Sequence, residues 1–437
     1  MPICFARRIR IACVFALLPV TALVDNATAQ QLGGAPDFGE PLLRPATGRW
    51  RFIPSLAFAY DSFGQSYTIS DRDTLDLVDE ASGRFVTSLM RTGPMSLEVQ
   101  NSLGLGQEAT RDDLHLGARW RGRRLELQLL DDLHLKAYRR HTDFGLSSDY
   151  ATNIARGIGT LSLSRAWRLR LEDQVELARF RQHTRYNYDY TRHDIMGEIE
   201  RRWGVFSAVR LGYGWGSRSV PDSTAIACGR HRLRAGWSQS LGPHLLTVDQ
   251  TLERRRYGDP AVRSHYVDYQ GALALSAAPA TGWRLRLEYR AWLTVYDTPD
   301  SIYTNAAEHT LELVVEKDVL GRTALGLGPV AEFRRTDSRF DPSYNQAGIK
   351  GTISYLAGPR LWVQFSNEMG VRSLLAVGDL TYYSDYFYNW STLYLSCGLV
   401  RRLNFDLFFS LSPESHEDPR HNSSTVLLST ALTWGLL

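Results

Sequence analysis

The chain has 437 residues, 43% of them hydrophobic and 22% charged, and its formal net charge is +3 at pH 7. Removal of an N-terminal export signal would lower that charge to about +1. Such a balance argues against a nucleic-acid groove and against a polybasic membrane-binding patch. The mature sequence also lacks the roughly 18 consecutive apolar residues that a membrane-spanning helix needs.

The N-terminus has the three parts of a secretory signal peptide. Arginines precede an apolar run at residues 11–24, and Ala-Thr-Ala stands directly before Gln30. We therefore predict a cleaved signal peptide at residues 1–29, export from the cytoplasm, and an N-terminal periplasmic segment at residues 30–48.

From residue 49 to residue 437 the chain alternates apolar and polar residues in segments of about ten. The first segment is Trp50–Tyr60, and the last, Thr425–Leu437, places Val426, Leu428, Leu432 and Trp434 in one row. A period of two is typical of strands, and strands of this length cross a bilayer when they are tilted. The alternation predicts a transmembrane antiparallel β-barrel.

Short and long connections alternate along this region, as in an up-and-down barrel with short periplasmic turns and longer outer loops. We expect tight turns near residues 92–94, 121–123, 166, 204, 241–243, 279–282, 320–321, 358–359 and 402. We expect longer polar segments at 61–83, 138–153, 183–191, 217–227, 257–263, 297–305, 335–344, 373–387 and 412–423. This punctuation gives about 20 strands, within a range of 16 to 22, in an all-β fold. A large soluble propeller or double sandwich is the alternative, but its strands would average about 5 to 6 residues.

Together, the signal peptide, the alternating strands, the two kinds of connection and the C-terminal strand resemble bacterial outer-membrane β-barrel proteins over Gln30–Leu437. The resemblance implies an outer-membrane location in a double-membraned bacterium. It also implies contact with lipid and lipopolysaccharide, and recognition of the final strand by the barrel-assembly machinery. Final strands of the class usually end in an aromatic residue, whereas this chain ends in Leu437.

If the apolar row faces lipid, the complementary row lines the lumen, and this row carries charges of both signs. The candidate lumen-lining residues are Arg168, Arg170, Glu172, Glu176, Glu198, Glu200, Arg202, Arg230, Arg232, Arg234, Arg284, Arg286, Glu288, Arg290, Glu312 and Glu316. Mixed charge argues against a strongly selective ion pore, and leaves open a constriction with separate positive and negative walls. These residues either brace a wet interior or recognise a substrate.

Antiparallel pairing predicts ladders of opposite charge within this row. We expect Arg284 and Arg286 to lie level with Asp318 and Glu316, and Arg290 to lie near Glu312. In the same way, the charges of residues 168–176 should lie beside those of residues 198–202.

Two acids, Asp131 and Asp173, fall in the row that should face lipid. A charge on the lipid face is costly near the midplane, so either a β-bulge shifts the register there or these positions lie outside the hydrocarbon band. We favour a bulge in the LLDDL run. Cys228 and Cys397 should face opposite sides of the sheet, which argues against a disulfide between them. Aromatic residues near strand ends predict interfacial girdles; they are Trp120, Tyr138, Trp167, Trp203, Trp215, Trp283, Tyr296, Tyr355, Trp390 and Trp434.

The sequence has no Gly-x-Ser-x-Gly elbow, Walker loop or His-Glu-x-x-His helix. The sequence closest to a metal motif runs from His416 to His421, which a proline interrupts. We therefore expect no catalytic residues, no metal and no cofactor.

The most favoured function is a porin-like channel or an export conduit, for small solutes or for a substrate that periplasmic partners deliver. The alternative is a non-conducting barrel whose long outer loops bind a polymer or a partner.

Overall fold

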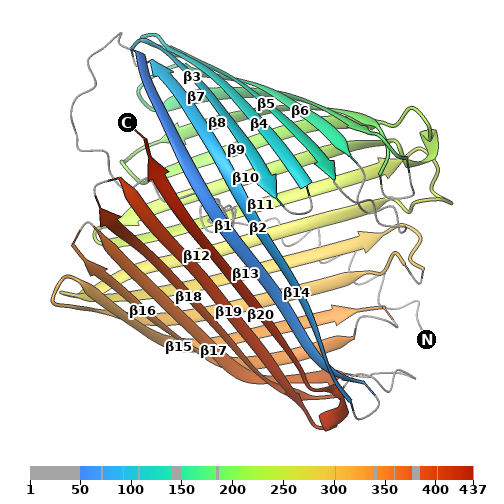
Figure 1. The fold of residues 1–437 in the computed structure, drawn as a ribbon. Coiled ribbons are helices and arrows are strands. Elements are labelled where there is room, and N and C mark those ends of the chain that lie inside the picture. Colours follow the sequence, from blue (N-terminus) through green and yellow to red (C-terminus); the bar gives the residue numbers. More distant parts are fainter. Residues whose placement is uncertain are drawn as a thin grey trace.

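The computed structural model describes residues 50–69, 72–91, 93–106, 109–138, 149–183, 187–300, 302–338, 342–358, 360–375, 384–400 and 402–436, with side chains left aside at 63–80. The predicted signal peptide and periplasmic segment lie outside these residues. Twenty strands form one antiparallel sheet that closes on itself (Figure 1). An all-β barrel of about 20 strands is thus confirmed.

The strand bounds follow the predicted segments closely. The strands are β1 Trp50–Ile69, β2 Arg72–Arg91, β3 Met95–Gly106, β4 Ala109–Arg121, β5 Leu125–Tyr138, β6 Tyr150–Ser162, β7 Trp167–Phe180, β8 Tyr190–Arg202, β9 Ala208–Ser219, β10 Cys228–Leu241, β11 His244–Tyr257, β12 Tyr266–Ala280, β13 Trp283–Tyr296, β14 Ala306–Val319, β15 Thr323–Thr336, β16 Ser343–Ala357, β17 Leu361–Leu375, β18 Tyr386–Val400, β19 Leu403–His416 and β20 Ser423–Gly435. Two short 3-10 helices, η1 Thr224–Ile226 and η2 Pro419–His421, lie in connections. In the described part of the chain, neither helix is long and apolar enough to cross a membrane.

The barrel closes where the first strand meets the last. Ser55 lies opposite Gly435, and Tyr67 lies opposite Ser423. The N–H of Leu436 donates to the carbonyl of Pro54 over 3.0 Å. An even number of antiparallel strands places the start of β1 and the end of β20 at the same rim.

The turns at this rim are tight, and their backbone geometry explains the glycines. Gly242, Gly282, Gly321 and Gly358 have φ between 63° and 71°, the left-handed region that glycine adopts at little cost. Leu320, at φ 58°, shares the β14–β15 turn with Gly321. The alternation of tight turns with longer connections is confirmed from β4 onward.

The first hairpin departs from the prediction of a polar loop over residues 61–83. The backbone of β1 and β2 stays paired from Asp61 opposite Glu80 to Ile69 opposite Arg72. Polar residues interrupt both alternating rows in this stretch, so the hydrophobic alternation that identifies the other strands is lost here. The backbone pairing of β1 with β2 continues without it. The hairpin is therefore longer than the apolar pattern indicated.

The expected bulge near Asp131 is wrong. The β4–β5 register runs without a shift from Ala109 opposite Tyr138 to Arg121 opposite Glu126, and β5–β6 is equally regular. Asp131 accepts a hydrogen bond from the side-chain amide of Asn153 over 2.8 Å. The outward carboxylate therefore keeps its place in the regular register and is hydrogen-bonded by a side chain of the neighbouring strand.

The outward row ends in aromatic and basic residues at the rim of the tight turns. Cations lie over three tryptophan rings, Arg91 over Trp50, Arg201 over Trp167 and Lys317 over Trp283, at 5.9, 5.6 and 4.7 Å from the ring centroids. Aromatic rings at such a rim suit the headgroup region of a bilayer.

Tyr138, Tyr296 and Trp390 are exceptions among the predicted girdle residues, because their register places them on the inner row. Trp390, for example, lies opposite the inward Glu368. Nearness to a strand end therefore did not reveal which face each ring occupies.

Candidate functional site: the charged inner wall

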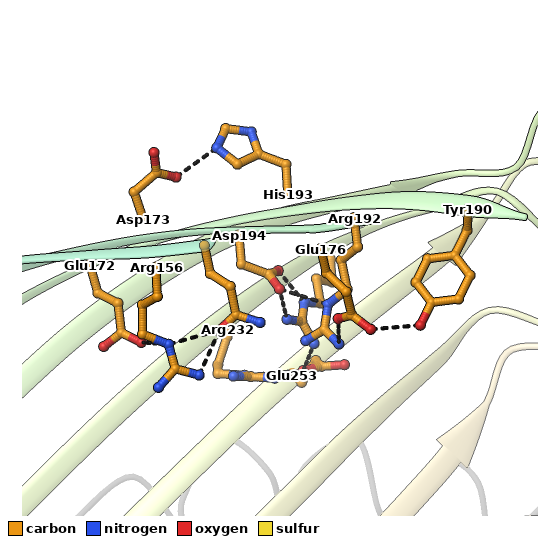
Figure 2. A network of polar contacts seen from close by, with 12 residues as sticks. Arg156, Glu172, Asp173, Glu176, Tyr190, Arg192, His193, Asp194, Arg232 and Glu253 are labelled. Carbon is orange, nitrogen blue, oxygen red and sulfur yellow. Dashed lines mark hydrogen bonds and ion pairs between the residues drawn. The ribbon is translucent and has the colours of Figure 1, made fainter. Parts of the chain in front are cut away.

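The inner and outer faces of the sheet separate cleanly at β7 and β8. Figure 2 shows Asp173 and His193 on one side of the sheet and Glu172, Glu176 and Asp194 on the other. Residues that lie opposite each other on neighbouring strands share a face, so the register extends this inner row from β7 to β10. Arg168 lies opposite Glu200, Arg170 opposite Glu198, Glu198 opposite Gly212, and Gly212 opposite Arg234. All sixteen residues singled out in the sequence lie on this inner row.

The first ion-pair network joins β6, β7 and β8. Arg156 Nε lies 3.5 Å from Glu172, which also pairs with Arg170 at 2.9 Å. Arg192 Nε lies 2.7 Å from Asp194, and its Nη1 lies 3.4 Å from Glu176. Glu172 and Glu176 thus take separate arginines, which fits a braced wall and not a pair of catalytic carboxylates.

The network continues into β10 and β11 through two acids (Figure 2). Arg230 donates from Nε to Asp194 over 2.7 Å. Glu253 accepts from Arg232 and Arg255 over 2.7 and 2.5 Å, and its side chain is only 8% exposed. Burial of a carboxylate is costly unless it is paired, and three arginines surround this one. Glu253, which the sequence analysis did not single out, is therefore a structural centre of the wall.

A second network joins β13, β14 and β16. Arg286 lies within 3.1 Å of Glu312, 3.5 Å of Glu288 and 3.6 Å of Glu316. Lys350 donates to Glu312 over 2.6 Å. Inner-face charges from three strands therefore form one cluster.

The predicted partners in this cluster are shifted by two residues. Arg284 lies opposite Glu316 and not Asp318, and Arg290 lies opposite Thr310 and not Glu312. Arg290 pairs instead with Glu288 on its own strand, at 3.0 Å. Alternation fixes the face of each residue, but the register depends on the outer connection at residues 297–305, whose geometry the alternation does not reveal.

A third cluster, which the sequence analysis missed, surrounds Arg372 on β17. Its guanidinium lies 4.0, 5.5 and 5.8 Å from the ring centroids of Tyr344, Tyr386 and Trp390. It also donates to Gln346 over 2.7 Å. The signal was present in the sequence, because Arg372 shares strand parity with the inward Glu368, and Tyr386 shares it with Trp390.

A cavity of about 680 Å³ opens on the inner wall between β8 and β14. Small residues such as Gly236 and Ala272 form its floor, while Glu198, Arg234 and Trp292 belong to its lining. Among the described residues, Glu198 and Arg234 form no ion pair. Their charges therefore border the cavity without an ion-pair partner in the described structure.

Two sectors of the inner row carry contrasting charge. The row over β9–β11 is mostly basic, with Arg210, Arg218, Arg230, Arg232, Arg234 and Arg255 against Asp249 and Glu253. The row over β14–β17 is mostly acidic, with Glu308, Glu312, Glu316, Asp318, Glu332 and Glu368 against Arg334, Lys350 and Arg372. Contrasting sectors produce an electric field across the space between them.

The remaining reactive side chains form neither a metal centre nor a disulfide within the described ranges. No group of three His, Cys, Asp or Glu residues there could hold a metal ion. The His416 ring instead packs against Tyr386, with centroids 4.6 Å apart. Cys228 and Cys397 are free thiols.

The fold is similar to solved bacterial outer-membrane barrels. The siderophore receptor PirA from Pseudomonas aeruginosa matches with a TM-score of 0.53 at 11% identity, over 87% of this chain and 80% of the receptor. A mutant of the ferric enterobactin receptor PfeA from the same organism matches with a TM-score of 0.51 at 10% identity, over 87% and 80%. OpdQ, also from Pseudomonas aeruginosa, matches with a TM-score of 0.47 at 10% identity, over 88% and 98%.

No family model matches the chain, and no curated protein matches it. The closed, all-antiparallel barrel and its likeness to the two receptors establish the fold. The fold is that of a bacterial outer-membrane β-barrel.

Proposed function

We propose that the protein is an outer-membrane channel for small, charged hydrophilic solutes. The observation that carries this proposal is a closed ring of twenty strands whose inner row is charged along most of its strands. Barrels of 16 to 18 strands already enclose an aqueous channel, whereas barrels of eight are filled by side chains. A wall of ionised side chains also requires water beside it.

The contrast between the basic and acidic sectors supports charged solutes as the cargo. Two wall sectors of opposite charge orient a dipolar solute and let its two charged ends exchange contacts with fixed side chains. Because most wall charges are paired with each other, each contact with a solute is weak and reversible. Such contacts suit passage better than tight binding.

The bilayer environment belongs to the same proposal. The outward apolar row would contact lipid acyl chains, and the outer connections would lie among lipopolysaccharide headgroups. The barrel-assembly machinery would recognise β20, whose edge pairs with β1 in the closed barrel. Periplasmic partners would deliver any substrate that moves outward.

Conductance of the purified barrel in a planar bilayer tests the proposal. With the same salt concentration on both sides of the bilayer, we expect steady, stepwise increases in conductance. A folded barrel that inserts and never conducts would contradict a channel and would favour the surface-binding alternative.

Selectivity then tests the role of the inner wall. Arg234→Gln should shift the reversal potential in a salt gradient toward cation preference, and Glu198→Gln should shift it toward anion preference. Both residues border the same cavity and neither has an ion pair in the described structure, so the two variants are matched. Equal reversal potentials in the unchanged protein and in both variants would show that this cavity does not lie on the conduction path.

A further inference from the structure

Hydrogen-bonded polar pairs lie on the outward face of the barrel, halfway up several hairpins. In each pair, a residue near the middle of the rising strand bonds to a residue on the descending strand, two places from its direct partner. We name these residues the outer polar belt: Asn101 with Asp112, Asp131 with Asn153, Asp173 with His193, Tyr213 with His231, Tyr289 with His309, and Asn367 with Asn389.

The belt lies at one height in the bilayer. Asp131, Asp173, Tyr289 and Asn367 each stand six residues beyond the first residue of their strand. At about 3.3 Å per residue and a tilt of about 40°, this position is roughly 15 Å above the rim, near the middle of an apolar band about 25 Å tall. Leu171 and Val175 flank Asp173 on the same face, so lipid-facing apolar residues lie on both sides of it.

The belt is not uniform around the barrel. Every carboxylate in it belongs to the three adjacent hairpins β3–β4, β5–β6 and β7–β8. The pairs on β13–β14 and β17–β18 contain only Tyr, His and Asn side chains. A lipid environment tolerates neutral, mutually satisfied groups better than carboxylates, so the carboxylate sector needs a further explanation.

The belt hydrogen bond satisfies only part of each carboxylate. Asp173 accepts from His193 over 2.7 Å and is still 56% exposed. A carboxylate has about four acceptor sites, and lipid chains supply no donor for the remaining ones. The amide of Asn153 has a second N–H beyond the one that it donates to Asp131. Within the described residues, donors and acceptors that make no further hydrogen bond therefore occur together on the same face.

The outward face of β6, at the centre of the carboxylate sector, carries few large side chains. The outward row of β6 consists largely of small residues, among them Ala151, Ala155, Gly157 and Gly159, and Gly197 on β8 has open space around it. Small residues let backbones approach closely within a membrane, as they do between packed transmembrane helices. Six strands at about 4.8 Å spacing and a height of about 25 Å offer roughly 700 Å², close to one side of a standard protein interface.

We propose that the lipid-facing sector of β3–β8 is an interface with a second copy of this chain. Copies that insert with the same polarity are related by an axis along the membrane normal, so residues at equal height meet. A belt at one height therefore meets the same belt, and each Asn153 can donate its second N–H to Asp131 of the other copy. A different protein would match only if it carried polar groups at that height too.

Cysteine cross-linking at the centre of the sector tests this proposal. In a Cys228→Ser, Cys397→Ser background, Ala155→Cys on β6 should form a disulfide dimer of twice the chain mass after mild oxidation of outer membranes. Ala291→Cys on β13 is the control. Ala291 lies at a similar height on the outward row of a different sector of the barrel, and this variant should stay monomeric. Monomers for both variants, equal dimers for both, or an Ala155→Cys adduct of any other mass would overturn the proposal.

A second measurement separates assembly from folding. Asp131→Leu with Asn153→Leu should lower the dimer fraction at least tenfold in native mass spectrometry from a mild detergent. The same double change at Asn367 and Asn389 should leave the dimer fraction unchanged. Heat-modifiable gel migration confirms that each barrel is folded. A dimer fraction that is equal in both double variants would overturn the assignment, whether or not the barrel conducts.

Discussion

Glu172 and Asp173 are neighbours on β7 with the same functional group, yet they occupy opposite faces of one sheet (Figure 2). Glu172 lies within 3.5 Å of two arginines in a network that crosses strands. In the described part of the chain, Asp173 hydrogen-bonds to His193 alone and has apolar neighbours along its row. Charges on the inner face form networks that cross several strands, whereas the groups of the outer polar belt bond to only one or two neutral or ionisable side chains of the neighbouring strand.

The largest effect should come from placing a new charge on the outer face. Leu233 on β10 faces outward and is 52% exposed, so Leu233→Arg should destabilise the barrel by about 2–4 kcal/mol near the midplane. Ser238→Arg on the inner row of the same strand should change stability by less than about 0.5 kcal/mol. Urea unfolding in lipid vesicles, followed by tryptophan fluorescence, measures both. Equal destabilisation would refute the assignment of faces.

The next effect concerns the most buried acid of the inner wall. Glu253→Gln would leave Arg232 and Arg255 without their shared carboxylate, and we expect a loss of about 2–3 kcal/mol. Arg284→Gln removes an arginine that is 66% exposed, and its expected cost is about 0–0.5 kcal/mol. Similar costs in the same urea titration would mean that burial does not distinguish the two sites.

A smaller loss of stability should distinguish a polar pair broken on the lipid-facing side from one broken on the water-facing side. His193→Leu leaves Asp173 without its donor in an apolar setting, at an expected cost of about 1–2 kcal/mol. Adding Asp173→Leu should recover most of the lost stability, because the double variant has no unpaired carboxylate on this face. On the inner face, Arg156→Leu should cost less than about 0.5 kcal/mol, since Glu172 keeps Arg170 and gains water. A double variant that is less stable than His193→Leu would contradict this explanation.

The alternation of residues predicted the faces well and the partners poorly. The two-residue period placed Arg168 and Arg284 on the inner row and Asp131 on the outer row without any knowledge of register. It could not show that Asn153 bonds to Asp131, or that Arg284 lies opposite Glu316, because those pairs depend on register and on the stagger of neighbouring strands. The bulge expected at Asp131 failed for the same reason, since a diagonal partner is not visible in one strand.

The sequence was least informative where no lipid boundary shapes it. Residues 61–69 and 72–83 pair as strands, yet neither stretch has an unbroken apolar row. The cluster around Arg372 was missed because Trp390, one of its three rings, was interpreted as part of an interfacial girdle. Strand parity with Glu368 on β17 would have placed Arg372 inside, so the face of this arginine could have been predicted from the sequence.

The smallest expected effect lies beyond both faces, in the outer connection at η2. The side chain and backbone N–H of Arg420 hydrogen-bond to Asp418 and lower the pKa of that carboxyl to about 2, below its ordinary value of 3.8. A depressed pKa means that the ionised form is favoured in the folded chain, so this contribution is fully present above about pH 4 and is lost as the pH falls toward 2. Carbon-13 NMR of a chain labelled at aspartate should therefore show Asp418 titrating near pH 2. The Arg420→Gln variant should move the midpoint up toward the ordinary value, and an unchanged midpoint would show that Arg420 does not set it.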